Sequence, residues 1–174
     1  TVISDKKILD NYALGKSKNK QEIGILFIER SMSLLKENGV AFIILPNSYL
    51  GNSTKNIIQL KDYIQSFKII AIIEFPSGTF SRSGTGVSTS LLIIQKKTPV
   101  KPYNIFIKRL NNIGYILNKK NTPYKYKKLD GEYVVESGKP VLDNDLNDCY
   151  TELSSFVSKE TISFINVSNA KKEY

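Results

Sequence analysis

The chain has 174 residues, of which 25 are Lys or Arg and 16 are Asp or Glu, and its formal charge is +9. It contains no His and one Cys, Cys149, which excludes catalytic triads and metal sites built on imidazole, disulfides, and thiolate clusters within the chain. An apolar content of 41%, with ten Tyr and eight Phe, predicts a folded domain with a hydrophobic core.

The first half of the chain alternates between helical and strand-like patterns. Apolar residues at helical spacing predict a helix over residues 20–37. Its apolar positions are Ile23, Leu26, Phe27, Leu34 and Leu35. A continuous apolar run over residues 40–45, closed by Pro46, predicts a strand that is buried on both faces. A second helix follows, with Ser53 or Thr54 as its cap and Ile57, Leu60 and Ile64 on one face.

A second buried strand is predicted over residues 68–75, and a third over residues 87–95 after a loop rich in Gly and Ser. A helix joins the first two strands, which predicts that they are parallel. The loop before the third strand is too short for a crossover helix, so that strand is predicted to be antiparallel. The fold class is therefore α/β, with three strands that form about half of an open Rossmann-like sheet.

The pattern changes after Pro99. Residues 99–142 predict a basic β extension, with a possible hairpin around Asn111-Asn112. Residues 143–174 predict a helical tail, in which Leu146, Tyr150, Leu153 and Phe156 or Val157 face inward, followed by a strand and a turn. Residues 1–98 form the third predicted unit, the sheet itself. No apolar run reaches the 18 residues of a membrane-spanning helix, so we expect no membrane partner and a cytoplasmic protein.

The positive charge is concentrated in one segment. Ten of the 25 basic residues lie between residues 95 and 128, where there is no Asp or Glu. Tyrosines such as Tyr115, Tyr124 and Tyr126 lie between them. Phosphate contacts combined with packing against bases or sugars would use such a segment. Alternatively, the basic segment is only a charged surface that keeps the protein in solution.

Two stretches carry a resemblance to a known family: ILFIERSMSLLKENGVAFIILPNSYLGNS (residues 25–53) and IIAIIEFPSGTFSRSGTGVSTSLLIIQKK (residues 69–97). They resemble the amino-group DNA adenine methyltransferases. They are most similar to the methylation (M) subunit of type I restriction–modification systems and to related fused enzymes. The resemblance implies transfer of a methyl group from S-adenosylmethionine to N6 of a flipped adenine in DNA of a bacterium or archaeon.

The resemblance also implies a pocket for the flipped base. Phe80 matches the aromatic residue that packs against the adenine, and stacking leaves the amino edge of the base free. Gly84, Thr85 and Gly86 match the loop that follows, and Pro46 and Asn47 match a strand end beside the pocket. Candidate DNA contacts come from the basic segment: Lys96, Lys97, Lys101, Lys108, Arg109, Lys119 and Lys120.

Two family motifs are absent from the chain. The glycine motif for S-adenosylmethionine is missing, and so is the catalytic Asn-Pro-Pro-aromatic motif, since no Asn-Pro dipeptide occurs. In type I relatives, the second motif would come just before residues 2–6. We therefore expect this chain to be an inactive fragment that binds neither cofactor nor metal alone, while the parent enzyme uses S-adenosylmethionine.

Three hypotheses follow for the function. The first is a fragment of a site-specific adenine N6-methyltransferase that acts on double-stranded DNA, with a specificity subunit and a restriction subunit as possible partners. The second is a non-catalytic DNA-binding module that retains part of a methyltransferase fold. The third is a subunit-interface module of the same origin. Phe80 and its glycine loop favour the first, because a protein that binds only the DNA backbone has no need of them.

Overall fold

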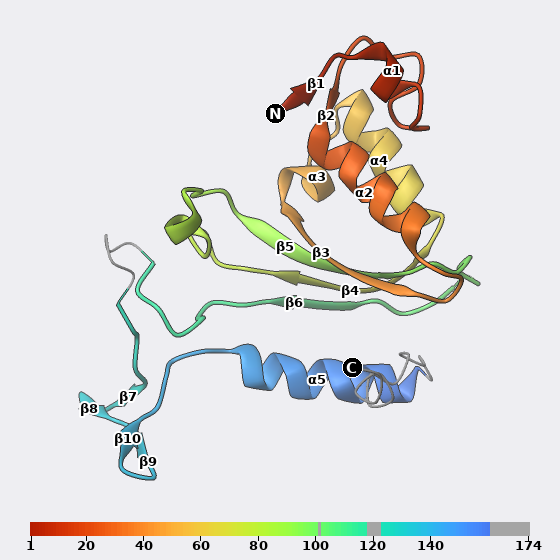
Figure 1. Ribbon diagram of the computed structural model, residues 1–174. Helices are drawn as coiled ribbons and strands as arrows, with labels where there is room; N and C mark the ends of the chain where they lie inside the picture. Colours follow the sequence, from red (N-terminus) through yellow and green to blue (C-terminus); the bar gives the residue numbers. More distant parts are fainter. Residues whose placement is uncertain (101, 118–122, 161–174) are drawn as a thin grey trace, which may run out of the picture.

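A computed structural model describes residues 1–100, 102–117 and 123–160. A four-stranded sheet forms the centre, with helices on both faces (Figure 1). Its strands, in the spatial order β3-β5-β4-β6, are β3 (Val40–Pro46), β5 (Thr89–Gln95), β4 (Lys68–Glu74) and β6 (Phe106–Arg109). Strand β5 is antiparallel to both of its neighbours, so β3 and β4 run in the same direction. The predicted α/β fold with an antiparallel third strand is confirmed.

The fourth strand, β6, extends the sheet beyond the boundary predicted at residue 98. It pairs in parallel with β4, from Ala71 opposite Phe106 to Glu74 opposite Arg109. The side chain of Ile107 is 73% exposed, whereas those of Phe106 and Lys108 are half-buried. This alternation is typical of an edge strand with one covered face.

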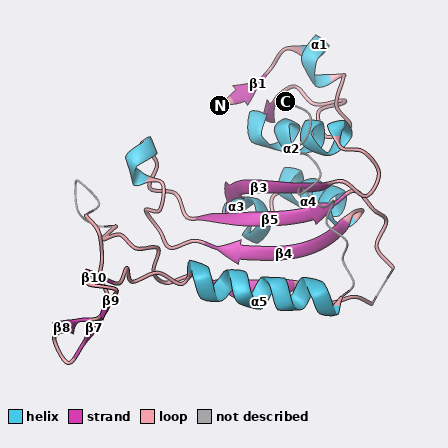
Figure 2. Ribbon diagram, turned by 60° about the horizontal axis from the view of Figure 1, so that its bottom comes forward, coloured by secondary structure: helices cyan, strands magenta, loops and turns pink. Residues whose placement is uncertain are grey.

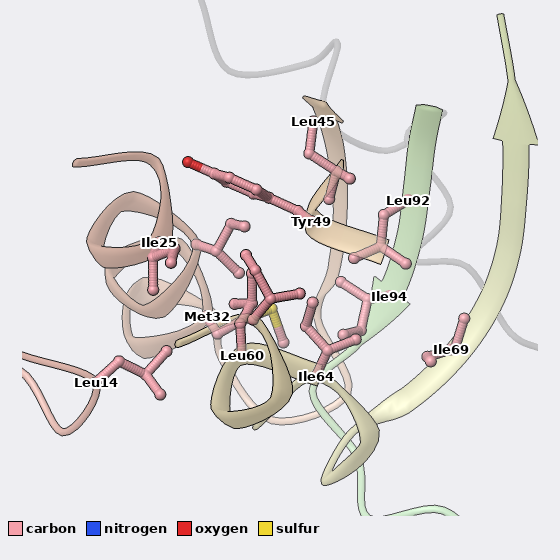
Figure 3. Close-up of a cluster of buried hydrophobic side chains, with 12 residues drawn as sticks. Leu14, Ile25, Met32, Leu45, Tyr49, Leu60, Ile64, Ile69, Leu92 and Ile94 are labelled. Carbon is pink, nitrogen blue, oxygen red and sulfur yellow. The ribbon is translucent and has the colours of Figure 1, made fainter. Parts of the chain in front are cut away.

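One face of the sheet is covered by two helices, α2 (Ile23–Leu34) and α4 (Lys55–Gln65), with the short α3 (Ser48–Gly51) between them in the chain. The predicted face of α4 is confirmed, since Ile57, Leu60 and Ile64 are at most 4% exposed. They pack in one cluster with residues of α2 and of β5 (Figure 3). This cluster is the larger of two hydrophobic cores.

The apolar residues that predict helix α2 do not all face the core. Ile25, Ile28 and Met32 are at most 3% exposed, whereas Ile23, Phe27 and Leu34, on which the helix prediction rests, are between 44% and 68% exposed. Leu26 is buried as predicted. The helix carries two apolar stripes, and helical spacing alone does not say which of them meets the sheet.

The opposite face of the sheet is covered by α5 (Leu146–Lys159), as Figures 1 and 2 show. Cys149 and Val157 are buried there in a second core with Ile70, Ile73 and Ile93. Two residues predicted to face inward are largely exposed, because Tyr150 lies on the solvent side of the helix and Leu146 is in its first turn, beyond the covered core. Their exposures are 45% for Leu146 and 72% for Tyr150. Leu153 and Phe156 pack against this core as predicted.

Between β6 and α5 the chain forms a small extension of short strands (Figure 1). These are β7 (Lys128–Leu129), β8 (Glu132–Tyr133), β9 (Val135–Glu136) and β10 (Lys139–Pro140), which pair as two antiparallel hairpins.

The predicted hairpin around Asn111-Asn112 is wrong, because Ile113 pairs with Asn144 instead. Asp145 accepts the backbone N–H groups of both asparagines, at 2.7 and 3.0 Å. Burial of Asp145 tends to raise its pKa, but these bonds outweigh that effect and lower the pKa. The predicted strand and turn in the tail fall largely within residues 161–174, which lie outside the described residues.

The first 22 residues pack beside α2. They contain β1 (Val2–Ile3), which pairs with β2 (Gln21–Glu22), and the short helix α1 (Lys6–Leu9). The Glu29 carboxylate accepts the backbone N–H groups of Ala13 and Leu14, at 2.6 and 2.8 Å, which joins this segment to α2. Among the described residues, no helix is long and apolar enough to cross a membrane.

Candidate functional site

Strands β3, β4 and β6 end at one edge of the sheet, where β5 begins. Two backbone bonds join this edge: Asn47 N–H donates to the Ser88 carbonyl, and Phe75 N–H donates to the Thr89 carbonyl, both at 2.9 Å. Pro46 and Asn47 therefore lie beside the strand that leaves the glycine-rich loop. Open α/β sheets bind their ligands at the carboxyl ends of their strands, so this edge is the candidate site.

Phe80 lies in the loop between β4 and β5. Its ring meets the ring of Phe75 edge to face, with 6.0 Å between centroids, and Phe80 is half-buried. The Thr79 hydroxyl donates to the Pro76 carbonyl at 2.7 Å, and a single 3₁₀ turn, η1 (Ser81–Ser83), follows. The loop thus has a defined shape that holds Phe80 against the end of β4.

Gly84 and Gly86, two of the three glycines of this loop, differ in whether the backbone requires glycine at that position. Gly84 has a φ of +82°, a left-handed conformation that glycine adopts without strain. A Cβ atom at Gly86 would have no neighbour within 4 Å, and its φ is not in the left-handed region. The fold of the described residues therefore explains Gly84 but does not require glycine at 86. Thr85 lies between them, and its hydroxyl accepts the Val87 N–H at 3.3 Å.

A polar network that the sequence did not predict lies at the same edge. The Asn47 side-chain amide donates to Glu74 at 3.0 Å, and its carbonyl oxygen accepts the Ser90 hydroxyl at 2.8 Å. Arg109 completes the network with an ion pair to Glu74 at 2.6 Å. Because Glu74 is an acceptor only, the network fixes which way round the Asn47 amide lies. The feature of the sequence that could have predicted this network is Glu74, a charged residue at the end of a strand whose interior is apolar.

The network and the Phe75–Phe80 pair lie on opposite faces of the sheet, since side chains alternate along β4. On the Phe75 side there is a cavity of about 280 Å³, most of whose lining is apolar. It is lined by Phe75, Thr79, Arg82, Ile113, Tyr115, Leu117 and Leu146. The structure thus brings the predicted pocket residues to one edge without enclosing them in one cavity.

The predicted DNA-contacting residues do not form one patch among the described residues. Lys96 donates to the Leu35 carbonyl at 2.8 Å, near the end of α2, and Lys97 lies next to it. Both lie at the far end of β5 from Phe80. Lys108 pairs with Glu152 at 2.7 Å, and this bond raises its pKa. Arg109 is held by Glu74, and the remaining candidates, Lys101, Lys119 and Lys120, lie outside the described residues.

Strand β3, at the outer edge of the sheet, carries two exposed apolar side chains. Phe42 is 60% exposed and Ile44 is 51% exposed, and β5 is the only strand that pairs with β3 in the described residues. A cavity of about 360 Å³ lies beside this edge, and its lining includes Ile23, Phe27 and Ile44. In the part of the chain that the structure describes, no group of three His, Cys, Asp or Glu residues could hold a metal ion.

One family model matches part of the chain. Residues 2–80 match the model of the family described as Eco57I restriction-modification methylase. No curated protein sequence matches the chain significantly.

Solved structures match the fold. A protein assigned as a class I S-adenosylmethionine-dependent methyltransferase from Listeria monocytogenes superposes with a TM-score of 0.53 at 21% identity, over 70% of this chain and 36% of that one. The modification subunit assigned to a type I restriction enzyme of Vibrio vulnificus gives 0.58 at 19% identity, over 87% and 28%. A structure from work on the assembly and conformational transition of a type I restriction–modification system gives 0.56 at 16%, over the same shares.

The chain spans only about a third of the length of these structures. Identities this low support the shared fold alone, while the family match covers the segment that leads from β1 to Phe80. The resemblance to restriction–modification methyltransferases is therefore confirmed, and the sheet of this chain is part of a methyltransferase fold.

Proposed function

We propose that this chain is part of a DNA adenine N6-methyltransferase of a restriction–modification system, and that it supplies one wall of the pocket for the flipped adenine. The observation that carries the proposal is the place of Phe80. It lies at the carboxyl edge of a methyltransferase sheet, half-buried against Phe75, in the stretch where the family match ends. An aromatic ring in that position can stack on an extruded base and leave its amino group free to react.

The residues of this chain do not fit S-adenosylmethionine. A nucleotide-type loop leads from a strand into a helix, whereas Gly84 and Gly86 lead into β5. The chain also has no Asn-Pro-Pro-aromatic motif. We therefore assign the methyl donor and the catalytic motif to another part of the parent enzyme.

The exposed edge of β3 supports the proposal that the rest of the catalytic domain lies in another part of the parent enzyme. A monomer seldom leaves an unpaired apolar strand edge in water, because such an edge invites association. Phe42 and Ile44, together with Phe27 of α2, would be covered if further strands of the parent enzyme continued the sheet from β3. Specificity and restriction subunits are further proposed partners, by likeness to type I systems.

The test is methylation in a bacterial host that lacks adenine methylation of its own. The parent enzyme should leave N6-methyladenine at a defined sequence, detectable by direct sequencing of the host DNA. Replacing Phe80 by Ala should slow turnover by about 1–3 kcal/mol in the activation free energy, which is the cost of one base–aromatic stack. Phe80→Tyr keeps the ring and should retain most of the activity.

A matched control is Tyr150→Ala, because Tyr150 is an aromatic residue on the solvent side of α5 and is 72% exposed. This variant should methylate at the normal rate. If Phe80→Ala turns over like Tyr150→Ala, and flipped-base fluorescence of 2-aminopurine is also unchanged, Phe80 has no role in holding the base.

The second candidate, a non-catalytic DNA-binding module, is favoured by the missing motifs. It predicts binding to duplex DNA with an affinity that falls steeply as salt rises, and no methylation by any polypeptide that contains the chain. Methylated host DNA would exclude this candidate.

A further inference from the structure

Four tyrosines of the extension form a continuous row of touching rings, which we name the tyrosine row: Tyr115, Tyr124, Tyr126 and Tyr133. Tyr115 and Tyr124 are stacked, with 5.3 Å between centroids and 27° between planes. Tyr124 lies 6.3 Å from Tyr126, which meets Tyr133 edge to face at 6.0 Å. The row joins the segment just after β6 to the hairpin of β7 and β8.

A cation lies over the ring at each end of the row. The guanidinium carbon of Arg82 is 5.5 Å from the centre of the Tyr115 ring, and the Lys128 ammonium is 4.6 Å from the centre of Tyr133. Both distances are within the range of cation–π attraction. The row therefore runs from the loop that carries Phe80 to the hairpin, with positive charge at both ends.

The strand pairing separates this row from two acidic residues of the extension, Asp143 and Glu132. Residues that pair directly point to the same face, and the pairs Tyr115–Tyr124 and Lys128–Tyr133 place these four on the face of the row. Lys125 alternates to the other face, where it forms an ion pair with Asp143 at 2.8 Å.

Glu132 is opposite Leu129, also away from the row. The face of the row thus carries aromatic rings and cations, and these two acidic side chains point elsewhere.

Packing within the protein does not account for the row. Tyr124 is 57% exposed and Tyr133 is 53% exposed, and both lie in the extension, where no described helix lies over them (Figures 1 and 2). A ring that serves a core would be covered by apolar side chains. These rings keep large areas open to a partner.

We propose that the tyrosine row binds DNA by stacking on bases that have left the helical stack. Exposed aromatic rings hold any base through its π face, and neighbouring cations attract the phosphates. The absence of acidic residues between residues 95 and 128 fits a polyanion better than a protein surface of mixed charge. The inference rests on the proposed function in one respect, that flipping one adenine leaves other bases unstacked near the Phe80 loop.

The experiment measures binding of the purified protein to a fluorescein-labelled single-stranded thymidine oligonucleotide by fluorescence anisotropy. Tyr124→Leu and Tyr133→Leu should each weaken binding roughly fivefold to a hundredfold, because each removes one stacking ring. Tyr124→Phe keeps the ring and should bind within about twofold of the wild type. Tyr150→Leu is the matched control, since it removes a tyrosine on α5 that is even more exposed, and it should bind normally.

Equal affinity of the wild type and the two Leu variants would overturn the proposal, as would an equal loss in Tyr150→Leu. If circular dichroism shows that the Leu variants do not fold, Lys128→Gln decides, because it removes a charge at the exposed end of the row. An unchanged affinity and an unchanged salt dependence in that variant would also overturn the proposal.

The outcome is separate from that of the proposed function. Binding that depends on the row, without methylation of host DNA, would leave the row in place and remove the methyltransferase role. Normal methylation of host DNA, together with oligonucleotide binding that the tyrosine variants do not weaken, would support the methyltransferase role and remove the proposed role of the row.

Discussion

At the scale of single residues, Tyr49 of α3 contacts β2 and α2 on the face of the sheet that α2 and α4 cover. Its hydroxyl donates to the Glu22 carboxylate at 2.9 Å, and its ring is 8% exposed. A Cβ atom at Gly24 would lie only 2.6 Å from that hydroxyl, so α2 can approach α3 this closely because residue 24 is glycine. Burial, and then the bond to Glu22, raises the pKa of Tyr49 to about 12.

This pKa predicts a loss of stability in alkaline solution. The folded state favours the protonated phenol, whose ordinary pKa is 10.0, so its contribution is complete below pH 10 and is lost as the pH rises from 10 towards 12. Tyr49→Phe lacks the hydrogen bond and should be less stable than the wild type at pH 8, by about 1 kcal/mol. The difference should shrink by pH 11.5. Urea unfolding at both pH values measures it, and a constant difference would contradict the assignment.

The candidate site could be predicted in part from single residues. The motif predicted that Phe80, Pro46 and Asn47 lie near one another, and all three do lie at one edge of the sheet, where β3 ends and where the loop after β4 begins; their role in a base pocket stays a prediction. Glu74 and Ser90 were missed, because each looks like an ordinary strand residue until β5 is seen to lie between β3 and β4. The network that they form with Asn47 depends on lateral order in the sheet, on which periodicity along the chain carries no information.

At the scale of elements, α4 and α5 show what helical spacing can and cannot decide. The predicted face of α4 is correct because the helix has one apolar stripe, and its other residues are mostly polar, with Ile58 as an exposed exception. In α5 the buried side centres on Cys149 and Val157, so Tyr150 lies in solvent although its spacing suits the core. The helical pattern treats Tyr150 as apolar, but a tyrosine side chain can also lie in water because of its hydroxyl group. The spacing of a tyrosine therefore predicts burial less well than that of an aliphatic residue.

The contact of α5 with the sheet can be followed through Cys149, the only cysteine in the chain. It is 4% exposed, and burial raises the pKa of its thiol, so both access and thiolate content are low in the folded state. We expect alkylation by iodoacetamide to be slow in the native protein and fast in urea. Val157→Ala, which opens a small cavity under α5, should speed alkylation by about fivefold or more, because the loss is about 1 kcal/mol.

The control for that measurement is Glu152→Gln. Glu152 pairs with Lys108 across the same contact, but the pair is partly exposed and should contribute less than about 1 kcal/mol. Alkylation in this variant should stay close to the wild-type rate. Rapid labelling of the native wild-type protein would show that α5 does not stay on the sheet.

At the scale of the whole molecule, the two edge strands of the sheet, β3 and β6, have different surroundings. Towards β6, the chain continues into the extension with its tyrosine row, which we assign to DNA. Towards β3, the surface is apolar and no described strand follows. If both proposals hold, this element has one contact surface for nucleic acid and one for protein, with the Phe80 loop at the edge of the sheet between them.

The apolar edge of β3 predicts self-association of the chain when it is isolated. Burying one exposed Phe contributes about 1.5–3 kcal/mol, so Phe42→Lys should weaken association by roughly tenfold to a hundredfold. Sedimentation equilibrium over a range of concentrations measures this. Val100→Lys is the control, because Val100 is 85% exposed in a loop away from this edge, and the substitution adds the same charge. If both variants associate like the wild type, β3 is not the contact surface. If both lose association equally, added charge alone explains the effect, and the case for further strands beside β3 loses its support.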